Sequence, residues 1–167
     1  MKIINNKVIG GVIAIAAMGA FAPAYAATGT GNASVEILQA ITVTENTALN
    51  FGQVTPSASA GTVAVDEASA RNCSGGATCV GTGTAAAGAF SITGTSGANV
   101  QISLPASASL TGPGTAMTAT LSSTSTSGAV TLTGGSANFN VAGSLAIGAN
   151  QVAGSYAGTY TVTVNYQ

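Results

Sequence analysis

Apolar and polar residues alternate along most of this chain, in short segments. The clearest segment is the last one, residues 156–166, where Tyr160, Val162, Val164 and Tyr166 share one parity and polar residues occupy the other. A period of two is typical of a β-strand with one buried face. The same pattern predicts strands over residues 33–43, 49–54, 61–66, 88–94, 98–104, 116–121, 129–133, 138–147 and 156–166.

Turn-forming residues separate these segments, and no segment has the periodicity of a helix. Clusters of Gly, Ser, Thr and Pro occupy Ser57–Gly61, Pro105–Ser109 and Gly112–Gly114, and residues 66–87 have the composition of an irregular loop. Short strands divided by such turns are typical of antiparallel sandwiches and barrels. The sequence therefore predicts an all-β fold with one domain.

The first 26 residues have the layout of a signal peptide. Lys2 and Lys7 precede the apolar run Val8–Phe21, and Ala24–Ala26 is a small-x-small cleavage site. This layout predicts export and a mature chain that begins at Ala27. The apolar run is short for a bilayer span, and no later run reaches that length, so we expect no membrane insertion.

Charge is scarce in the mature chain, and this scarcity excludes several classes of function. Arg71 is the one cation, against Glu36, Glu45, Asp66 and Glu67, which gives a net charge of 1 − 4 = −3. Nucleic-acid binding needs several cations at the phosphates, so we expect none. General acid–base catalysis has no His or Lys to use, so we expect no enzyme, metal or cofactor. Glu36 and Glu45 are predicted on polar faces, and Asp66 and Glu67 at a solvated strand end beside Arg71.

The two cysteines lie close together, at Cys73 and Cys79. An exported chain meets an oxidising compartment, where such a pair forms a disulfide. Metal binding would need further ligands that this chain lacks. We therefore predict a local structural disulfide.

The segment after the signal peptide has an apolar face of its own. Ala33, Val35 and Ile37 share one parity, which continues through Ile41 and Val43. One interpretation is an ordinary first strand of this domain. The other is a donor strand: residues 27–39 would form an extension that enters a groove of a neighbouring molecule, and residues 40–167 would form the domain.

Two motifs resemble those of known families. Gly154, the alternating strand through Tyr160, Val162 and Val164, and the penultimate Tyr166 resemble the C-terminal signature of chaperone–usher pilus subunits. Residues 48–54, with Leu-Asn-Phe-Gly at their centre, resemble a motif of spore-coat-protein-U-like and archaic-type pilins. The whole mature chain resembles a small secreted bacterial β-protein family of unknown function.

This resemblance implies an immunoglobulin-like β-sandwich that lacks its final strand. A donor strand bearing Ala33, Val35 and Ile37 would complete it, and the segment with Gly154, Tyr156 and the later apolar residues would line the groove. The implied partners are other copies or related subunits, a periplasmic chaperone and an outer-membrane usher. The implied product is a pilus or fimbria on the cell surface, which supports adhesion or biofilm formation.

Two alternatives to the fibre subunit remain open. The domain could complete its own sheet and serve as a secreted coat or matrix protein. A small outer-membrane β-barrel is less favoured, because the mature chain has six aromatic residues and ends on Gln167, whereas such barrels carry aromatic girdles.

Overall fold

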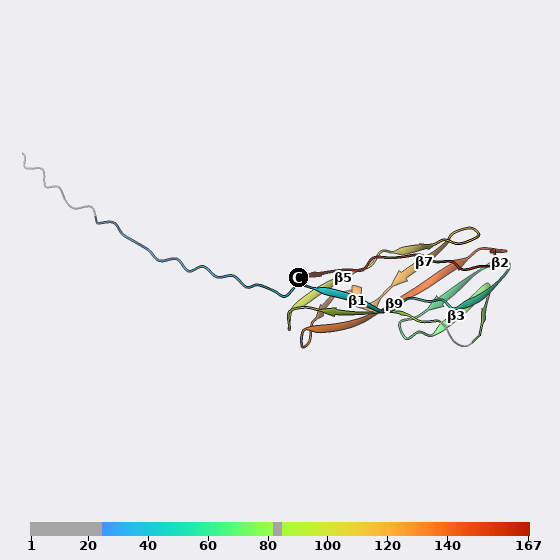
Figure 1. Ribbon diagram of the computed structural model, residues 1–167, viewed down its shortest axis with the longest axis horizontal. Helices are drawn as coiled ribbons and strands as arrows, with labels where there is room; N and C mark the ends of the chain where they lie inside the picture. The colour runs from blue at the N-terminus through green and yellow to red at the C-terminus, as the bar shows by residue number, and fades with distance from the viewer. Residues whose placement is uncertain (1–24, 82–84) are drawn as a thin grey trace, which may run out of the picture. The chain divides into compact units, whose positions relative to one another are not determined.

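The computed structural model describes residues 25–81 and 85–167, so most of the predicted signal peptide lies outside the described residues. The chain divides into two units, one ending at Val35 and one spanning Glu36–Gln167. Residues 25–35 of the first unit are exposed and have no hydrogen-bonded secondary structure. The second unit is the folded domain (Figure 1).

The described part of the domain is built from strands and one short 3-10 helix. The strands are β1 (Thr42–Thr47), β2 (Gln53–Val65), β3 (Arg71–Val80), β4 (Gly88–Thr93), β5 (Asn99–Ser103), β6 (Ser107–Leu110), β7 (Met117–Ser122), β8 (Ala129–Thr131), β9 (Ser136–Ile147) and β10 (Thr163–Tyr166). The helix is η1 (Thr124–Thr126).

The strands form two antiparallel sheets. The larger sheet has the order β1-β4-β9-β2-β3, and β7, which carries β6 on its other side, also pairs with β9 (Figure 1). The smaller sheet has the order β10-β5-β8. These sheets confirm the predicted all-β antiparallel sandwich.

One hydrophobic core joins the two sheets. Along β9 every second residue is buried, from Phe139 to Ile147, and the residues between them are more exposed. The smaller sheet contributes Val100 and Ile102 from β5 to the same cluster. The alternation that predicted these strands therefore marks the faces that lie between the sheets.

Residues 66–87 were predicted as a loop, and this prediction was wrong. β3 occupies Arg71–Val80 and pairs along its length with β2, which is one long strand where the sequence suggested two. A tight turn joins them, since the Asp66 carboxylate accepts hydrogen bonds from the Ala68 and Ala70 amides at 2.9 and 2.7 Å. The Gly/Ser/Thr-rich sequence of β3 has no apolar alternation, so the pattern gave no sign of a strand. Backbone pairing with β2 holds this strand instead.

The predicted disulfide is present and lies within β3. Cys73 and Cys79 are joined, with their Cα atoms 5.6 Å apart. The pairing of β2 with β3 skips from Pro56↔Ala77 to Gly61↔Gly75 between them. The disulfide therefore spans, on β3, the point where the pairing with β2 is irregular.

Arg71 was predicted beside Asp66 and Glu67, and its side chain instead forms hydrogen bonds with backbone carbonyls. The Arg71 guanidinium donates to the carbonyl oxygens of Gln53, Val80 and Gly81 at 3.3, 3.2 and 2.7 Å. The Glu67 carboxylate instead accepts from the amide and hydroxyl of Thr124, which ties the β2–β3 turn to η1.

Three further boundaries differ from the prediction. The first strand begins at Thr42 rather than at residue 33, and β6 lies partly in the Pro105–Ser109 segment that was predicted as a turn. Of residues 156–166, Thr163–Tyr166 form strand β10, and Ala157 makes one isolated bridge with Thr111. The apolar pattern continues beyond the paired backbone at both ends of the chain.

Candidate functional site: an apolar groove beside the C-terminal segment

The Leu-Asn-Phe-Gly motif forms one wall of a groove. Gly52 has φ +73°, a conformation that favours glycine, and its amide donates to Asn50 Oδ1 at 2.8 Å. Leu49 and Phe51 cover Gly143 of β9, where an added Cβ would lie 2.9 and 2.8 Å from their side chains. The motif therefore turns the chain into β2 while two apolar side chains pack against β9.

The opposite wall is the segment that leads toward β10. Gly154 has φ +149° and lies against the ring of Pro113, so a side chain there would be both strained and obstructed. The Tyr156 ring covers Gly112 and Gly114, where an added Cβ would lie 2.6 and 2.5 Å from its atoms. Glycines on both sides thus let the chain and the Tyr156 ring approach closely.

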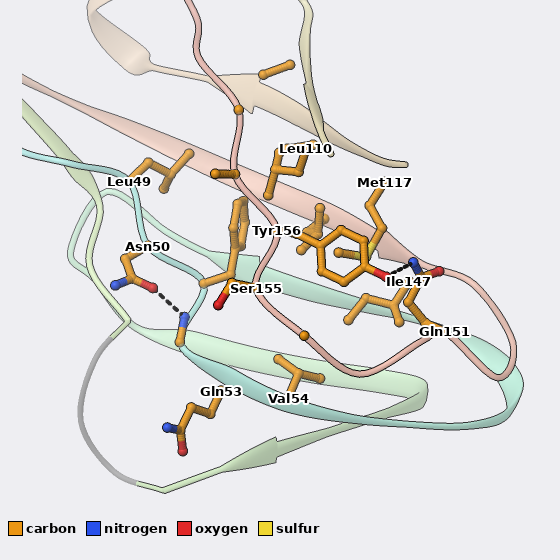
Figure 2. Close-up of a pocket in the computed structure, with 18 of the residues that line it drawn as sticks. Leu49, Asn50, Gln53, Val54, Leu110, Met117, Ile147, Gln151, Ser155 and Tyr156 are labelled. Atoms are coloured by element: carbon orange, nitrogen blue, oxygen red, sulfur yellow. Dashed lines mark hydrogen bonds between the residues drawn. The ribbon is translucent and has the colours of Figure 1, made fainter. Parts of the chain in front are cut away.

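Hydrogen bonds fix the orientation of Tyr156. Its hydroxyl donates to the carbonyl of Val152 at 2.9 Å and accepts from Gln151 Nε2, also at 2.9 Å. Gln151 Nε2 donates in addition to the carbonyl of Thr115 at 2.6 Å. In Figure 2 the ring projects from its segment into the groove.

Between these walls lies an open groove of about 850 Å³. Figure 2 shows Leu49 and Asn50 on one wall, and Tyr156 with Gln151 on the other. Apolar side chains from β6, β7 and β9 form its floor: Ala108, Leu110, Met117, Ala119, Leu121, Leu145 and Ile147. The hydrophobic core is therefore reachable from outside at this end of the domain.

The C-terminal segment continues past the groove with the predicted parity. Tyr160, Val162, Val164 and Tyr166 are half-buried against the core, and the residues between them are exposed. Within the described residues, β10 pairs with β5 alone, and β1 pairs with β4 alone. Each of these two strands therefore has one edge without a paired strand.

Tyr166 links the end of the chain to the start of the domain. Its hydroxyl accepts from the Thr95 amide at 2.8 Å and donates to the Gln39 carbonyl at 2.6 Å. The Gln39 amide in turn donates to the Thr95 hydroxyl at 2.6 Å. Gln39 is the polar residue between Ile37 and Ile41 on the apolar parity of the N-terminal segment. It is also the residue that anchors this segment to the domain. Sequence reasoning missed this role, and the break in parity was its only signal.

Glu45 was predicted on a polar face, and the register of β1 contradicts this. Val43 pairs with Ile92 and Glu45 with Phe90, so Glu45 has the same parity as the apolar residue Val43. Opposite-facing Thr44 pairs with Ser91. The Glu45 carboxylate therefore lies on the parity of β1 that faces the core, and Glu45 is exposed because no strand covers the other edge of β1.

The Tyr160 side chain reaches β4, the strand that pairs with β1. Its ring meets Phe90 edge-on with centroids 6.1 Å apart, and its hydroxyl lies over Gly88, where an added Cβ would be 2.5 Å away. This buried hydroxyl has no hydrogen-bond partner among the described residues. Burial, and then the charge of Glu45, raises the pKa of Tyr160 to about 12.

The apolar residues of the N-terminal extension are exposed. The side chains of Val35 and Ile37 are 85% and 88% exposed, and Ala33 is exposed as well. Large apolar side chains with this exposure mark an interaction surface when several lie together.

Residues 25–81 and 85–167 contain neither a cluster of metal-binding side chains nor a membrane-spanning helix. Within these ranges no three His, Cys, Asp or Glu residues gather in a way that could hold a metal ion. None of the helices described there has the length and apolar character needed to cross a membrane.

The fold and the groove define an antiparallel β-sandwich with an apolar cleft beside the segment that leads to its last strand. Residues 41–166 match the profile of the family described as a domain of unknown function (DUF4402), so the chain belongs to this family. No curated protein and no solved structure matches the chain.

Proposed function

We propose that this protein is a structural subunit of a bacterial surface fibre, assembled by donor-strand exchange. The N-terminal extension of one copy fills the groove and the unpaired edge of the next. The fibre is exported through the inner membrane, held by a periplasmic chaperone, assembled at an outer-membrane usher, and supports adhesion or biofilm formation.

The observation that carries this proposal is the match between two uncovered apolar surfaces. The groove exposes core residues such as Met117 and Ile147 beside the segment that leads to β10, a strand with an unpaired edge. The extension carries Val35 and Ile37, whose burial would contribute about 1.5–3 kcal/mol each. An added strand gains backbone hydrogen bonds along its length, and alternate side chains give specificity.

The direction of the chain favours exchange between copies over completion of the domain by its own extension. Tyr166 holds Gln39 at one end of the unpaired edge, and the groove at Tyr156 lies at the other end. A strand that runs antiparallel to residues 156–166 has its C-terminal end at Tyr156, so the rest of its chain must continue from that end. The extension of the same copy is attached at the Tyr166 end, so it could enter only in the less stable parallel direction. The extension of another copy meets no such restraint.

Assembly of this kind produces a filament. The surface that donates differs from the surface that accepts, so contacts are head-to-tail and need not close into a ring. The low charge of the mature chain leaves little repulsion between subunits.

The test is assembly of the mature chain with Val35→Asp and Ile37→Asp. We expect the double variant to remain monomeric while keeping the β-sheet circular dichroism of the wild type. Ser34→Asp, on the opposite parity of the extension, is the matched control and should polymerise normally. Polymers that form equally well from all three proteins would contradict the proposal.

The wild-type protein from the cell surface gives a second readout. Run on a detergent gel without heating, it should form a ladder of multiples of the subunit mass, which collapses to monomer on boiling. A single monomer band in both lanes, with the protein free in the medium, would favour a self-complete secreted coat or matrix protein.

A further inference from the structure

Glu45 and Tyr160 are polar groups close to the two unpaired edges that an incoming strand would occupy: Glu45 pairs with Phe90 from β1, and the Tyr160 ring packs edge-on against Phe90. Glu45 lies on the inward parity of β1, and the buried Tyr160 hydroxyl has no hydrogen-bond partner among the described residues. An incoming strand would cover the exposed Glu45 next to the Tyr160 hydroxyl, which is already buried. A buried carboxylate and an unpaired hydroxyl each carry a cost unless a hydrogen bond satisfies them.

The length of the extension suggests where this pair meets the incoming strand. Ala27–Ile37 and Tyr156–Tyr166 have the same length, since 37 − 27 and 166 − 156 are both 10. Full antiparallel pairing of these segments places Ile37 opposite Tyr156 and Ala27 opposite Tyr166. In this register Ala33 lies opposite Tyr160, and the groove-facing residues of the incoming strand have odd numbers.

The sizes of the side chains fit this register. The groove-facing residues of the extension decrease from Ile37 and Val35 to Ala33 and then to two glycines, Gly31 and Gly29. The open groove of about 850 Å³ lies at the Tyr156 end, where the large residues would enter. At Tyr160 the interior is already occupied by the tyrosine ring, which packs on Phe90 and reaches Gly88.

We propose that Glu45 and Tyr160 form a polar subsite that accepts a small residue, Ala33 of a second copy, and thereby fixes the register of the incoming strand. This inference rests on the proposed strand exchange. Once the incoming strand covers Glu45, its carboxylate accepts a hydrogen bond from the Tyr160 hydroxyl, and both groups are satisfied. A strand displaced by two residues would place Val35 over the pair and leave the groove at Tyr156 without Ile37.

The experiment uses the mature chain with Val35→Asp and Ile37→Asp. This variant keeps its groove, but its own extension cannot fill the groove of another copy. The probe is a fluorescent synthetic peptide of residues 27–38, whose dissociation constant is measured by anisotropy. An Ala33→Leu peptide should bind at least about tenfold more weakly, because the leucine meets the Tyr160 ring. A Ser34→Leu peptide is the control and should bind as the native peptide does.

The receptor side is tested by a double-mutant cycle. Glu45→Ala and Tyr160→Phe should each weaken binding of the native peptide about tenfold, and the double variant should bind no more weakly than either single one, because they remove the same hydrogen bond. Thr44→Ala, on the outer face of β1, should leave affinity unchanged.

The possible failures are distinguishable. Binding of the native peptide with equal affinity to all receptor variants would overturn the polar subsite and leave strand exchange intact. Equal binding of the Ala33→Leu peptide would overturn the register. No binding of the native peptide at all would overturn strand exchange itself, and this inference with it.

Discussion

The hydroxyl of Tyr166, the penultimate residue, donates to the carbonyl oxygen of Gln39 at 2.6 Å. The same hydroxyl accepts from the Thr95 amide at 2.8 Å, so three distant parts of the chain meet at one oxygen atom. This contact fixes where the N-terminal extension leaves the domain. It therefore also fixes the end of the unpaired edge from which that extension would reach a neighbour.

Removing the Tyr166 hydroxyl should loosen this anchor. We expect Tyr166→Phe to lower the free energy of unfolding by about 1–2 kcal/mol, because the Thr95 amide and the Gln39 carbonyl lose their shared partner. Tyr166→Ser should cost about 3–5 kcal/mol, since the ring that packs against the core is lost as well. Urea unfolding followed by circular dichroism measures both values. Thr163→Ala, on the exposed parity of β10, is the control, and an equal loss there would contradict the anchor.

Gly154 should not tolerate a side chain. Its φ of +149° is accessible essentially to glycine alone, and the ring of Pro113 occupies the space of a Cβ. We expect Gly154→Ala to destabilise the domain by about 1–3 kcal/mol. Gly128 is a matched control, because nothing lies within 4 Å of an added Cβ there and its φ is not in the positive region. Equal thermal midpoints for the two alanine variants would show that Gly154 imposes no such constraint.

The disulfide should contribute modestly to stability, since it closes a short loop. Cys73 and Cys79 are separated by six positions, for which loop entropy gives about 2 kcal/mol. We expect the double Cys→Ser variant to lose about this much free energy of unfolding in urea. A reducing agent should lower the stability of the wild type to the same level and leave the variant unchanged. A wild type insensitive to reduction would contradict a stabilising role.

Alkaline pH should destabilise the domain through Tyr160. Burial raises the pKa of its hydroxyl from 10.0 to about 12, so between these values the unfolded chain releases a proton that the folded domain keeps. The contribution of Tyr160 to stability is complete below pH 10 and is lost as the pH rises toward 12. Urea midpoints measured between about pH 9 and about pH 11.5 should fall less steeply for Tyr160→Phe than for the wild type. Parallel curves would show that Tyr160 titrates normally.

Much of the fold could be predicted from alternation alone. β4, β5, β7 and β9 follow the predicted segments closely, because each buries one face between two sheets and period two records that burial directly. β3 escaped prediction because backbone pairing with β2 holds it, while its side chains lack an apolar pattern. β6 escaped because its short sequence has the composition of a turn.

The candidate site, too, could be predicted from the sequence only in part. The apolar parity of the C-terminal segment and of the extension could be found in the sequence, because both patterns are local. Glu45 could not be placed, since its face depends on the register of β1 with β4, and a shift of one residue would reverse it. Nor could Tyr166 be paired with Gln39, which lies 127 positions earlier.

The sequence by itself determined the all-β class, the apolar faces, the disulfide and the glycines that allow close turns, because these properties depend on residues near one another in the chain. The tertiary structure alone decided which strands pair and which edges remain unpaired. It also decided that core residues of β6, β7 and β9 line a groove beside Tyr156. Those features depend on contacts between segments far apart in sequence, and no local pattern of residues encodes them.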